Sequence, residues 1–122
     1  MIDLHTHTTV SDGTDTPAQL VNKAMAQGLG TLAITDHDAI AGWSSAVQTL
    51  RGDLKLVLGA EISCLTKAGI SVHMLGLLFD GTNSALLETL ENTRDDRLPR
   101  MRKMIELMQA DGIDISIADV EA

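Results

Sequence analysis

The order of apolar patterns along the chain is the feature that most constrains its fold. Short apolar runs typical of strands alternate with longer segments whose apolar residues recur at helical spacing. The patterns predict strands over residues 2–7, 31–35, 55–58 and 70–79, and helices that begin at residues 17, 39 and 84. Strands that alternate with helices of this length indicate an α/β fold built on a largely parallel sheet.

Local signals define the ends of the predicted helices. Thr16 is expected to cap the first helix, with Pro17 at the first helical position and Gln19 closing a capping box. Asp38 is expected to cap the second helix. Pro99 interrupts the apolar periodicity of the last helical segment, so we expect a kink or two separate helices there.

Composition narrows the classes of protein to which the chain can belong. Its 122 residues fit one ordinary domain, and a content of 44% hydrophobic and 21% charged residues argues against a disordered chain. Aromatic residues make up 2%, too few for a stacking platform that binds single-stranded nucleic acid. The net charge of -8 argues against a broad basic surface for duplex DNA or for a membrane.

Cysteine usage and the N-terminal sequence bear on the cellular compartment. The single cysteine, Cys64, excludes an internal disulfide and a cysteine-cluster zinc site, and we expect its side chain to be buried in an intracellular protein. The sequence contains no apolar run long enough for a membrane helix and no signal-peptide pattern. We therefore expect a cytoplasmic protein.

The four histidines carry the clearest chemical signal. All lie on predicted strands or at strand ends, near several carboxylates; the set comprises His5, His7, Asp12, Asp36, His37, Asp38, Glu61 and His73. The carboxyl ends of parallel strands form the ligand-binding edge of such sheets, and imidazole with carboxylate suits Zn, Mn or Fe. Taken singly, each residue is more often a satisfied polar group, a turn or a helix cap. Their joint placement favours a metal site.

Four ordered segments resemble the motifs of the PHP (polymerase and histidinol phosphatase) family. They are residues 5–13 (H-x-H-x-x-x-S-D-G), 35–38 (Thr-Asp-His-Asp), 59–63 (G-x-E-x-S) and 73–76 (H-x-L-G). The resemblance extends over the whole chain and is nearest to small stand-alone phosphoesterases that act on nucleotides and short RNA ends. It implies a distorted seven-stranded β/α barrel, of which residues 1–122 would form the front half, the N-terminal part of one PHP domain.

The resemblance also implies a role for each candidate residue. His5 and His7 would bind one metal ion, Glu61 would bridge two, His73 would bind the second, and Asp12 and His37 would bind a third. Two or three divalent ions (Mn, Zn or Fe) are implied, and Asp12, His37 and Glu61 are expected to be the catalytic residues. The implied reaction is hydrolysis of phosphate esters of nucleotides or short RNA ends by metal-activated water.

The family pattern also includes a later His motif and a C-terminal Asp-x-His motif, which have no counterpart here because no histidine follows His73. We therefore expect this chain alone to hydrolyse phosphate esters poorly. We also expect it to self-associate through an open sheet edge, because the strands that would close the barrel are missing.

Three further readings of the sequence remain open. Five of the nine basic residues lie between Arg94 and Lys103, either as a solvated helix face or as a clamp for a substrate phosphate, for which Arg97 is the first candidate. An amidohydrolase-type barrel also begins with H-x-H, although the Ser-Asp-Gly and Thr-Asp-His segments favour the PHP family. A non-catalytic metal-binding or assembly module is the remaining alternative.

Overall fold

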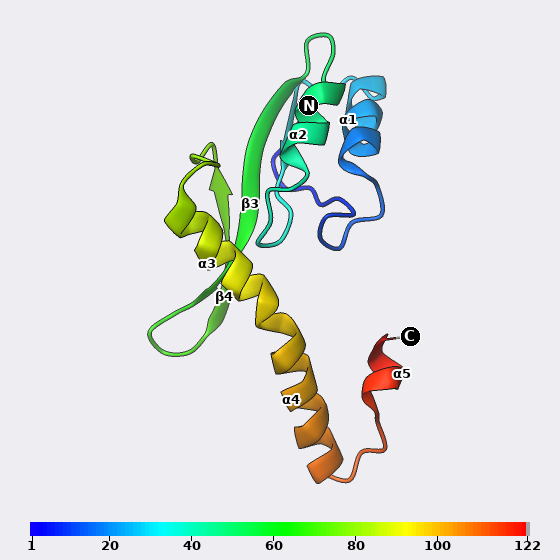
Figure 1. The fold of residues 1–122 in the computed structure, drawn as a ribbon. Coiled ribbons are helices and arrows are strands. Elements are labelled where there is room, and N and C mark those ends of the chain that lie inside the picture. Colours follow the sequence, from blue (N-terminus) through cyan, green and yellow to red (C-terminus); the bar gives the residue numbers. More distant parts are fainter. Residues whose placement is uncertain (122) are drawn as a thin grey trace.

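The computed structural model describes residues 1–121 and contains one four-stranded sheet flanked by helices (Figure 1). In chain order the elements are β1 (Ile2–Asp3), α1 (Pro17–Ala26), β2 (Thr31–Ile34), α2 (Trp43–Thr49), β3 (Lys55–Leu65), β4 (Ser71–Leu77), α3 (Ser84–Asp95), α4 (Arg97–Ala110) and α5 (Ile117–Glu121). The strand order in the sheet follows the chain, β1-β2-β3-β4. The α/β class predicted from the sequence is therefore confirmed, and the seven-strand count is not reached by the described residues.

The sheet is mixed rather than largely parallel. β1, β2 and the first four residues of β3 pair in parallel, whereas the last seven residues of β3 pair with β4 in antiparallel register. β3 is thus longer than the strand predicted over residues 55–58 and continues through Glu61. The change of partner falls at Gly59, where a Cβ atom would lie 2.5 Å from the Gly76 carbonyl oxygen, so only glycine permits this close approach.

The first strand is shorter than predicted. β1 ends at Asp3, and the segment after it attaches to the chain following β2 through threonine side chains. The Thr6 amide donates to Thr35 Oγ1 at 3.1 Å, and Thr35 Oγ1 donates to the Thr6 carbonyl at 3.0 Å. These contacts take the place of a regular ladder, so His5 and His7 lie beyond the strand rather than on it.

The core lies between β2 and the first two helices, which pack side by side (Figure 1). The capping box predicted at the start of α1 is present, with the Thr16 hydroxyl accepting from the Gln19 amide. The buried cluster comprises Val21, Ala24, Leu32, Ile34, Ala46 and Leu54. This cluster anchors β2, whose carboxyl end leads directly into the residues of the candidate site.

The second helix begins later than predicted, and Asp38 does not cap it. α2 starts at Trp43 after Gly42, which makes no side-chain capping bond. Asp38 instead has a left-handed backbone conformation (φ 49°) and a buried side chain with other partners. Trp43 packs beside the Phe79 ring and donates Nε1–H to the Gly59 carbonyl at 3.0 Å.

Two helices occupy residues 84–110, as Pro99 predicts. They are separated at Asp96, one residue before α4 begins. Pro99 has no amide hydrogen to donate to Asp95, and its ring would clash with the Asp95 carbonyl in a continuous helix, so the helix is interrupted just before it. α4 then points away from the sheet and α5 lies alongside its far end (Figure 1).

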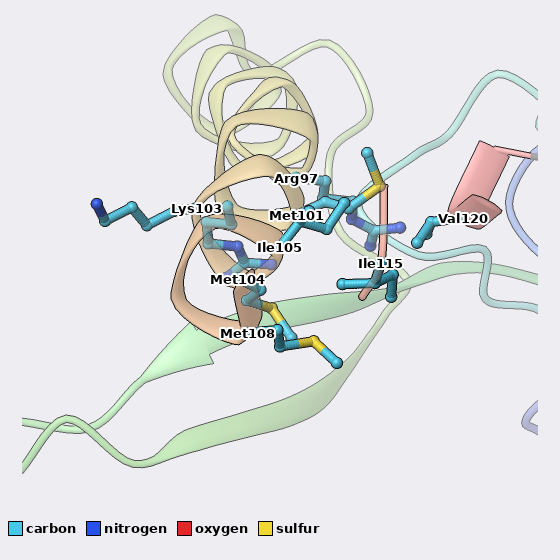
Figure 2. A pocket seen from close by; sticks show the side chains of 9 residues that line it. Arg97, Met101, Lys103, Met104, Ile105, Met108, Ile115 and Val120 are labelled. Carbon is cyan, nitrogen blue, oxygen red and sulfur yellow. The ribbon is translucent and has the colours of Figure 1, made fainter. Parts of the chain in front are cut away.

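A groove of about 580 Å³ lies between α4 and α5 (Figure 2). Its lining is mainly apolar and includes Met101, Met104, Ile105, Met108 and Ile115. None of its lining residues is a histidine or a carboxylate. The groove therefore lacks the imidazole and carboxylate donors of a Zn, Mn or Fe site.

The structure bears on the predicted burial of Cys64 and on the search for a membrane-spanning helix. Cys64 was expected to be buried and is only partly so, because β3 ends close to it in an exposed hairpin. None of the described helices combines the length and the hydropathy needed to cross a bilayer.

Candidate metal centre

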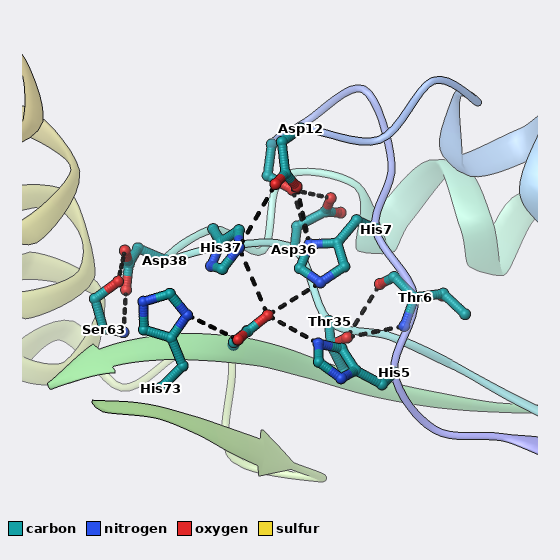
Figure 3. Close-up of polar contacts among 12 residues, drawn as sticks. His5, Thr6, His7, Asp12, Thr35, Asp36, His37, Asp38, Ser63 and His73 are labelled. Carbon is teal, nitrogen blue, oxygen red and sulfur yellow. Dashed lines mark hydrogen bonds and ion pairs between the residues drawn. The ribbon is translucent and has the colours of Figure 1, made fainter. Parts of the chain in front are cut away.

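The candidate site is organised around the carboxylate of Glu61, which lies on β3 with only 7% of the residue exposed. Oε2 lies 2.8 Å from His5 Nε2 and 3.0 Å from His7 Nε2, and Oε1 lies 2.9 Å from His73 Nδ1. His37 Nε2 is 3.6 Å from Oε2. One carboxylate is therefore in contact with all four imidazoles of the chain, which converge from three different segments (Figure 3).

The imidazoles form a continuous row. Neighbouring ring centroids are 5.1 Å apart for His5 and His7, 4.7 Å for His7 and His37, and 5.0 Å for His37 and His73. Asp12 extends the set on one side, with Oδ1 3.1 Å from His7 Nδ1 and Oδ2 3.7 Å from His37 Nε2. The row and the two carboxylates bring ring nitrogens and carboxylate oxygens from four segments of the chain, residues 5–12, 37, 61 and 73, into one place.

These donors fall into three overlapping groups, in each of which the ligand atoms lie within 4.8 Å of one another. The groups are His5, His7 and Glu61; His7, Asp12 and His37; and His37, Glu61 and His73. His37 Nδ1 is buried and has no hydrogen-bond partner among the described residues. Imidazole with carboxylate is the donor chemistry that Zn, Mn and Fe accept, so the residues present fit the divalent ions that the sequence predicts.

The electrostatics of the two carboxylates agree with a cation-binding role. Burial would raise the pKa of Glu61, but hydrogen bonds to His5 and His73 and the nearby charge of His37 outweigh burial and lower that pKa. Burial also acts to raise the pKa of Asp12. The hydrogen bond from Ser11 and the charge of His7 outweigh burial, so the pKa of Asp12 lies below its usual range. Both groups are therefore ionised at neutral pH, as metal ligands must be.

The loop that carries Asp12 is held by a buried carboxylate. Asp36 accepts from the Thr8 amide at 2.7 Å, the Thr8 hydroxyl at 2.8 Å and the Ser11 hydroxyl at 2.7 Å. Gly13 closes the same loop, where a Cβ atom would lie 2.4 Å from the His7 carbonyl oxygen. Asp36 therefore positions the segment that presents Asp12 and does not itself belong to the three donor groups.

Asp38, the residue after His37, is held by a different set of partners. Oδ1 accepts from the Ser63 amide at 2.8 Å, and Oδ2 accepts from the Ser63 hydroxyl at 2.8 Å and from Arg97 Nη2 at 2.7 Å. Burial would raise the pKa of Asp38, yet the Ser63 bonds and Arg97 lower it. Arg97, predicted as a phosphate clamp, thus begins α4 in an ion pair with Asp38, the residue that follows His37.

The six residues predicted as ligands all come together in this site: His5, His7, Asp12, His37, Glu61 and His73. Their roles as metal ligands stay predictions, as does the catalytic role of Asp12, His37 and Glu61. Sequence reasoning missed the positioning bonds of Asp36 and the contact between Asp38 and Arg97. The Ser-Asp-Gly segment could have indicated the bonds of Asp36, because Ser11 in that segment donates one of them.

Comparison with known proteins identifies the family. The PHP domain family matches residues 3–89, which include all six candidate ligands and end in α3. The chain belongs to the PHP domain family. α4 and α5 lie outside the matched residues, so the assignment of residues 1–122 to one PHP domain stays a prediction.

Several relatives of this PHP chain have named activities. It is 39% identical over 108 residues to a 5'-3' exoribonuclease of Haemophilus influenzae, with 85% of the chain and 39% of the relative covered. It is 36% identical over 113 residues to a 3',5'-nucleoside bisphosphate phosphatase of Chromobacterium violaceum, with 92% of the chain and 39% of the relative covered. The chain therefore spans about two fifths of the length of these relatives.

Solved structures show the same relationship. A Bifidobacterium adolescentis protein described as a metal-dependent phosphoesterase superposes with a TM-score of 0.79 at 41% identity, over 98% of this chain and 41% of that one. An amidohydrolase of Chromobacterium violaceum, solved with bound sulfate and no metal, superposes with a TM-score of 0.79 at 36% identity. The match covers 92% of this chain and 39% of the amidohydrolase. The described half-barrel sheet thus corresponds to part of a larger structure in both proteins.

Proposed function

We propose that this chain supplies the N-terminal part of a metal-dependent phosphoesterase that hydrolyses phosphate esters of nucleotides or short RNA ends. The observation that carries the proposal is the contact of one buried carboxylate, Glu61, with all four imidazoles. The activities named for the relatives, exoribonuclease and nucleoside bisphosphate phosphatase, favour phosphate esters as the substrate class.

The chain's own residues would act first as a scaffold for cations. His5, His7 and Glu61 would hold one ion, His37, Glu61 and His73 a second, and His7, Asp12 and His37 a third. Bound divalent ions would supply a water nucleophile at neutral pH and stabilise charge on the phosphoryl oxygens. Because Glu61 belongs to two of the groups, it is the residue on which the largest part of the site depends.

The exposure of the ligand set leaves room for a substrate. The side chains of His5, His73 and Asp12 are 51%, 47% and 65% exposed, whereas that of Glu61 is 10% exposed. The carboxylate thus lies at the base of the site and the more exposed groups surround it. Arg97, at 40% exposure, is our candidate for binding a phosphate oxygen there, since the guanidinium group matches phosphate geometry.

Metal content and phosphate release test the proposal together. The purified chain, reconstituted with Mn²⁺, Fe²⁺ or Zn²⁺, should retain transition metal in elemental analysis. Phosphate release from adenosine 3',5'-bisphosphate and from a 5'-phosphorylated oligoribonucleotide should depend on that metal. A chain that retains none of these metals after reconstitution would refute the metal centre. Release of amine from amide substrates without release of phosphate would instead favour amidohydrolase chemistry.

A graft tests the expected incompleteness of the site. We expect slow turnover by the 122-residue chain and faster turnover when the remaining three fifths of the Chromobacterium violaceum relative are joined to it. Equal turnover by the two proteins would show that the described ligands suffice. In the faster protein, Arg97→Ala should weaken turnover of phosphate substrates more than metal content.

A further inference from the structure

The contact between Arg97 and Asp38 connects two parts of the molecule that otherwise touch little. Arg97 is the first residue of α4, which projects away from the sheet (Figure 1). Within residues 1–121, it makes the one hydrogen bond or ion pair that joins α4 to the strands and loops of the metal centre. The position of this guanidinium relative to the metal centre therefore depends on one carboxylate.

The Asp38 carboxylate is unusually well fixed. Its side chain is fully buried, and both oxygens accept hydrogen bonds from Ser63 on β3, one from the amide and one from the hydroxyl. Its backbone has φ 49°, a conformation that residues other than glycine seldom adopt. On β3, Ser63 lies two positions after Glu61, and Asp38 directly follows His37. The Asp38 carboxylate is therefore held next to two of the candidate ligands in the sequence.

We propose that Asp38 is a positioning residue that, supported by Ser63, holds Arg97 at the edge of the metal centre for contact with a substrate phosphate. This inference rests on the proposed function. A guanidinium group has five N–H donors, and Asp38 takes one nitrogen, Nη2, at 2.7 Å. Within residues 1–121, the remaining donors bond no other residue and stay free for phosphate oxygens.

A purely structural role would predict different behaviour. If Asp38 only fastened α4, its removal would change stability and would affect ligand binding in the same way whether or not Arg97 were present. If Asp38 acts through Arg97, its removal should have no further effect on phosphate binding once Arg97 is gone. A double-mutant cycle separates these two cases.

The experiment measures binding of adenosine 5'-monophosphate to the Mn²⁺-loaded chain by calorimetry, with metal content determined in parallel. The variants are Asp38→Asn, Arg97→Ala and the double variant, with Arg102→Ala as the control, an exposed arginine on the same helix. We expect Asp38→Asn and Arg97→Ala each to weaken nucleotide binding by about tenfold or more, the loss expected when a hydrogen bond to a charged phosphate is removed. Metal content should not change, Arg102→Ala should resemble the parent, and the double variant should bind no more weakly than Arg97→Ala.

Three results would overturn the inference. They are unchanged nucleotide binding in Asp38→Asn, an equal effect of Asp38→Asn with and without Arg97, and a metal-loaded parent that does not bind the nucleotide. A parent that takes up no metal contradicts the proposed function instead, and the same cycle is then measured on the metal-free chain. Should Asp38→Asn fail to fold, Ser63→Ala provides the test, with a smaller weakening in the same direction expected.

Discussion

Replacing Glu61 with glutamine tests the metal centre most directly. The substitution keeps the size of the side chain and one oxygen that can accept from His73, but it removes the negative charge and one ligand oxygen. Glu61 belongs to two of the three donor groups, so both should lose affinity. Loss of partners that merely orient ligands weakens metal sites by about 10–100-fold, and loss of a ligand itself should reach at least the upper end.

The expected size of the effect follows from linkage. At a free Mn²⁺ concentration about 100 times the parent dissociation constant, binding stabilises the folded chain by about 2.7 kcal/mol. A site about 100-fold weaker gains only about 0.4 kcal/mol under the same conditions. The difference of about 2.3 kcal/mol corresponds to about 9 °C in Tm, at about 4 °C per kcal/mol for a domain of this size.

Thermal unfolding with and without Mn²⁺ measures this difference, and elemental analysis gives the number of ions retained. Glu88→Gln is the matched control, because Glu88 is an exposed carboxylate on α3 outside the three donor groups. Asp12→Asn, which belongs to one group, should lose less metal than Glu61→Gln. A rise in Tm with Mn²⁺ that is the same in Glu61→Gln and in the parent would refute the assignment of Glu61 as a shared ligand.

Four further predictions concern the supporting structure, the pH dependence and the sheet edge. Asp36→Ala removes the acceptor of three hydrogen bonds and should lower the free energy of unfolding by about 3 kcal/mol or more in urea titrations, with Asp53→Ala, at an exposed position, as the control. Metal affinity should be lower at pH 5.5 than at pH 7.5, because metal binding displaces protons from imidazole ligands; equal affinity at the two pH values in calorimetry would contradict imidazole ligation. Gly13→Ala should disrupt the loop and reduce metal content more than Gly30→Ala, where a Cβ atom has 3.6 Å of clearance, as elemental analysis would show. The 122-residue chain should form dimers or larger species in light scattering, because β4 has an unpaired edge with Val72 and Met74 exposed; a monomer at all concentrations would refute this.

The site residues could be predicted because their signals are local. His5 and His7 are two residues apart, and Asp12 follows in the same motif. His37 comes three residues after the end of β2, whose apolar residues are plain in the sequence. The rule that the carboxyl ends of parallel strands meet at one edge then brings them together. The rule uses the order and direction of the strands and not their exact lengths, so it grouped these residues even though β1 is two residues long.

The errors arose where distant residues compete with local signals. Aspartate is a common helix cap, but the Asp38 carboxylate accepts hydrogen bonds from Ser63 and Arg97, which lie 25 and 59 residues away in the sequence. The helix instead starts at Trp43 without a side-chain cap. The length of β3 was underestimated because Gly59 and Ala60 resemble a strand end. Their small size instead allows β4 to approach, and no local pattern reports that pairing.

The change of partner along β3 has a consequence for the order in which the molecule assembles. The β3–β4 hairpin joins residues close in sequence and can form early, whereas the parallel pairing of β1, β2 and β3 requires closure of much longer loops. The hairpin alone brings together only Glu61 and His73, and each donor group needs a histidine from an earlier segment. A divalent ion therefore has no complete group to bind until the parallel strands have docked. Bound metal should then slow unfolding while leaving the folding rate nearly unchanged, so that it prolongs the lifetime of the folded chain rather than guiding its formation.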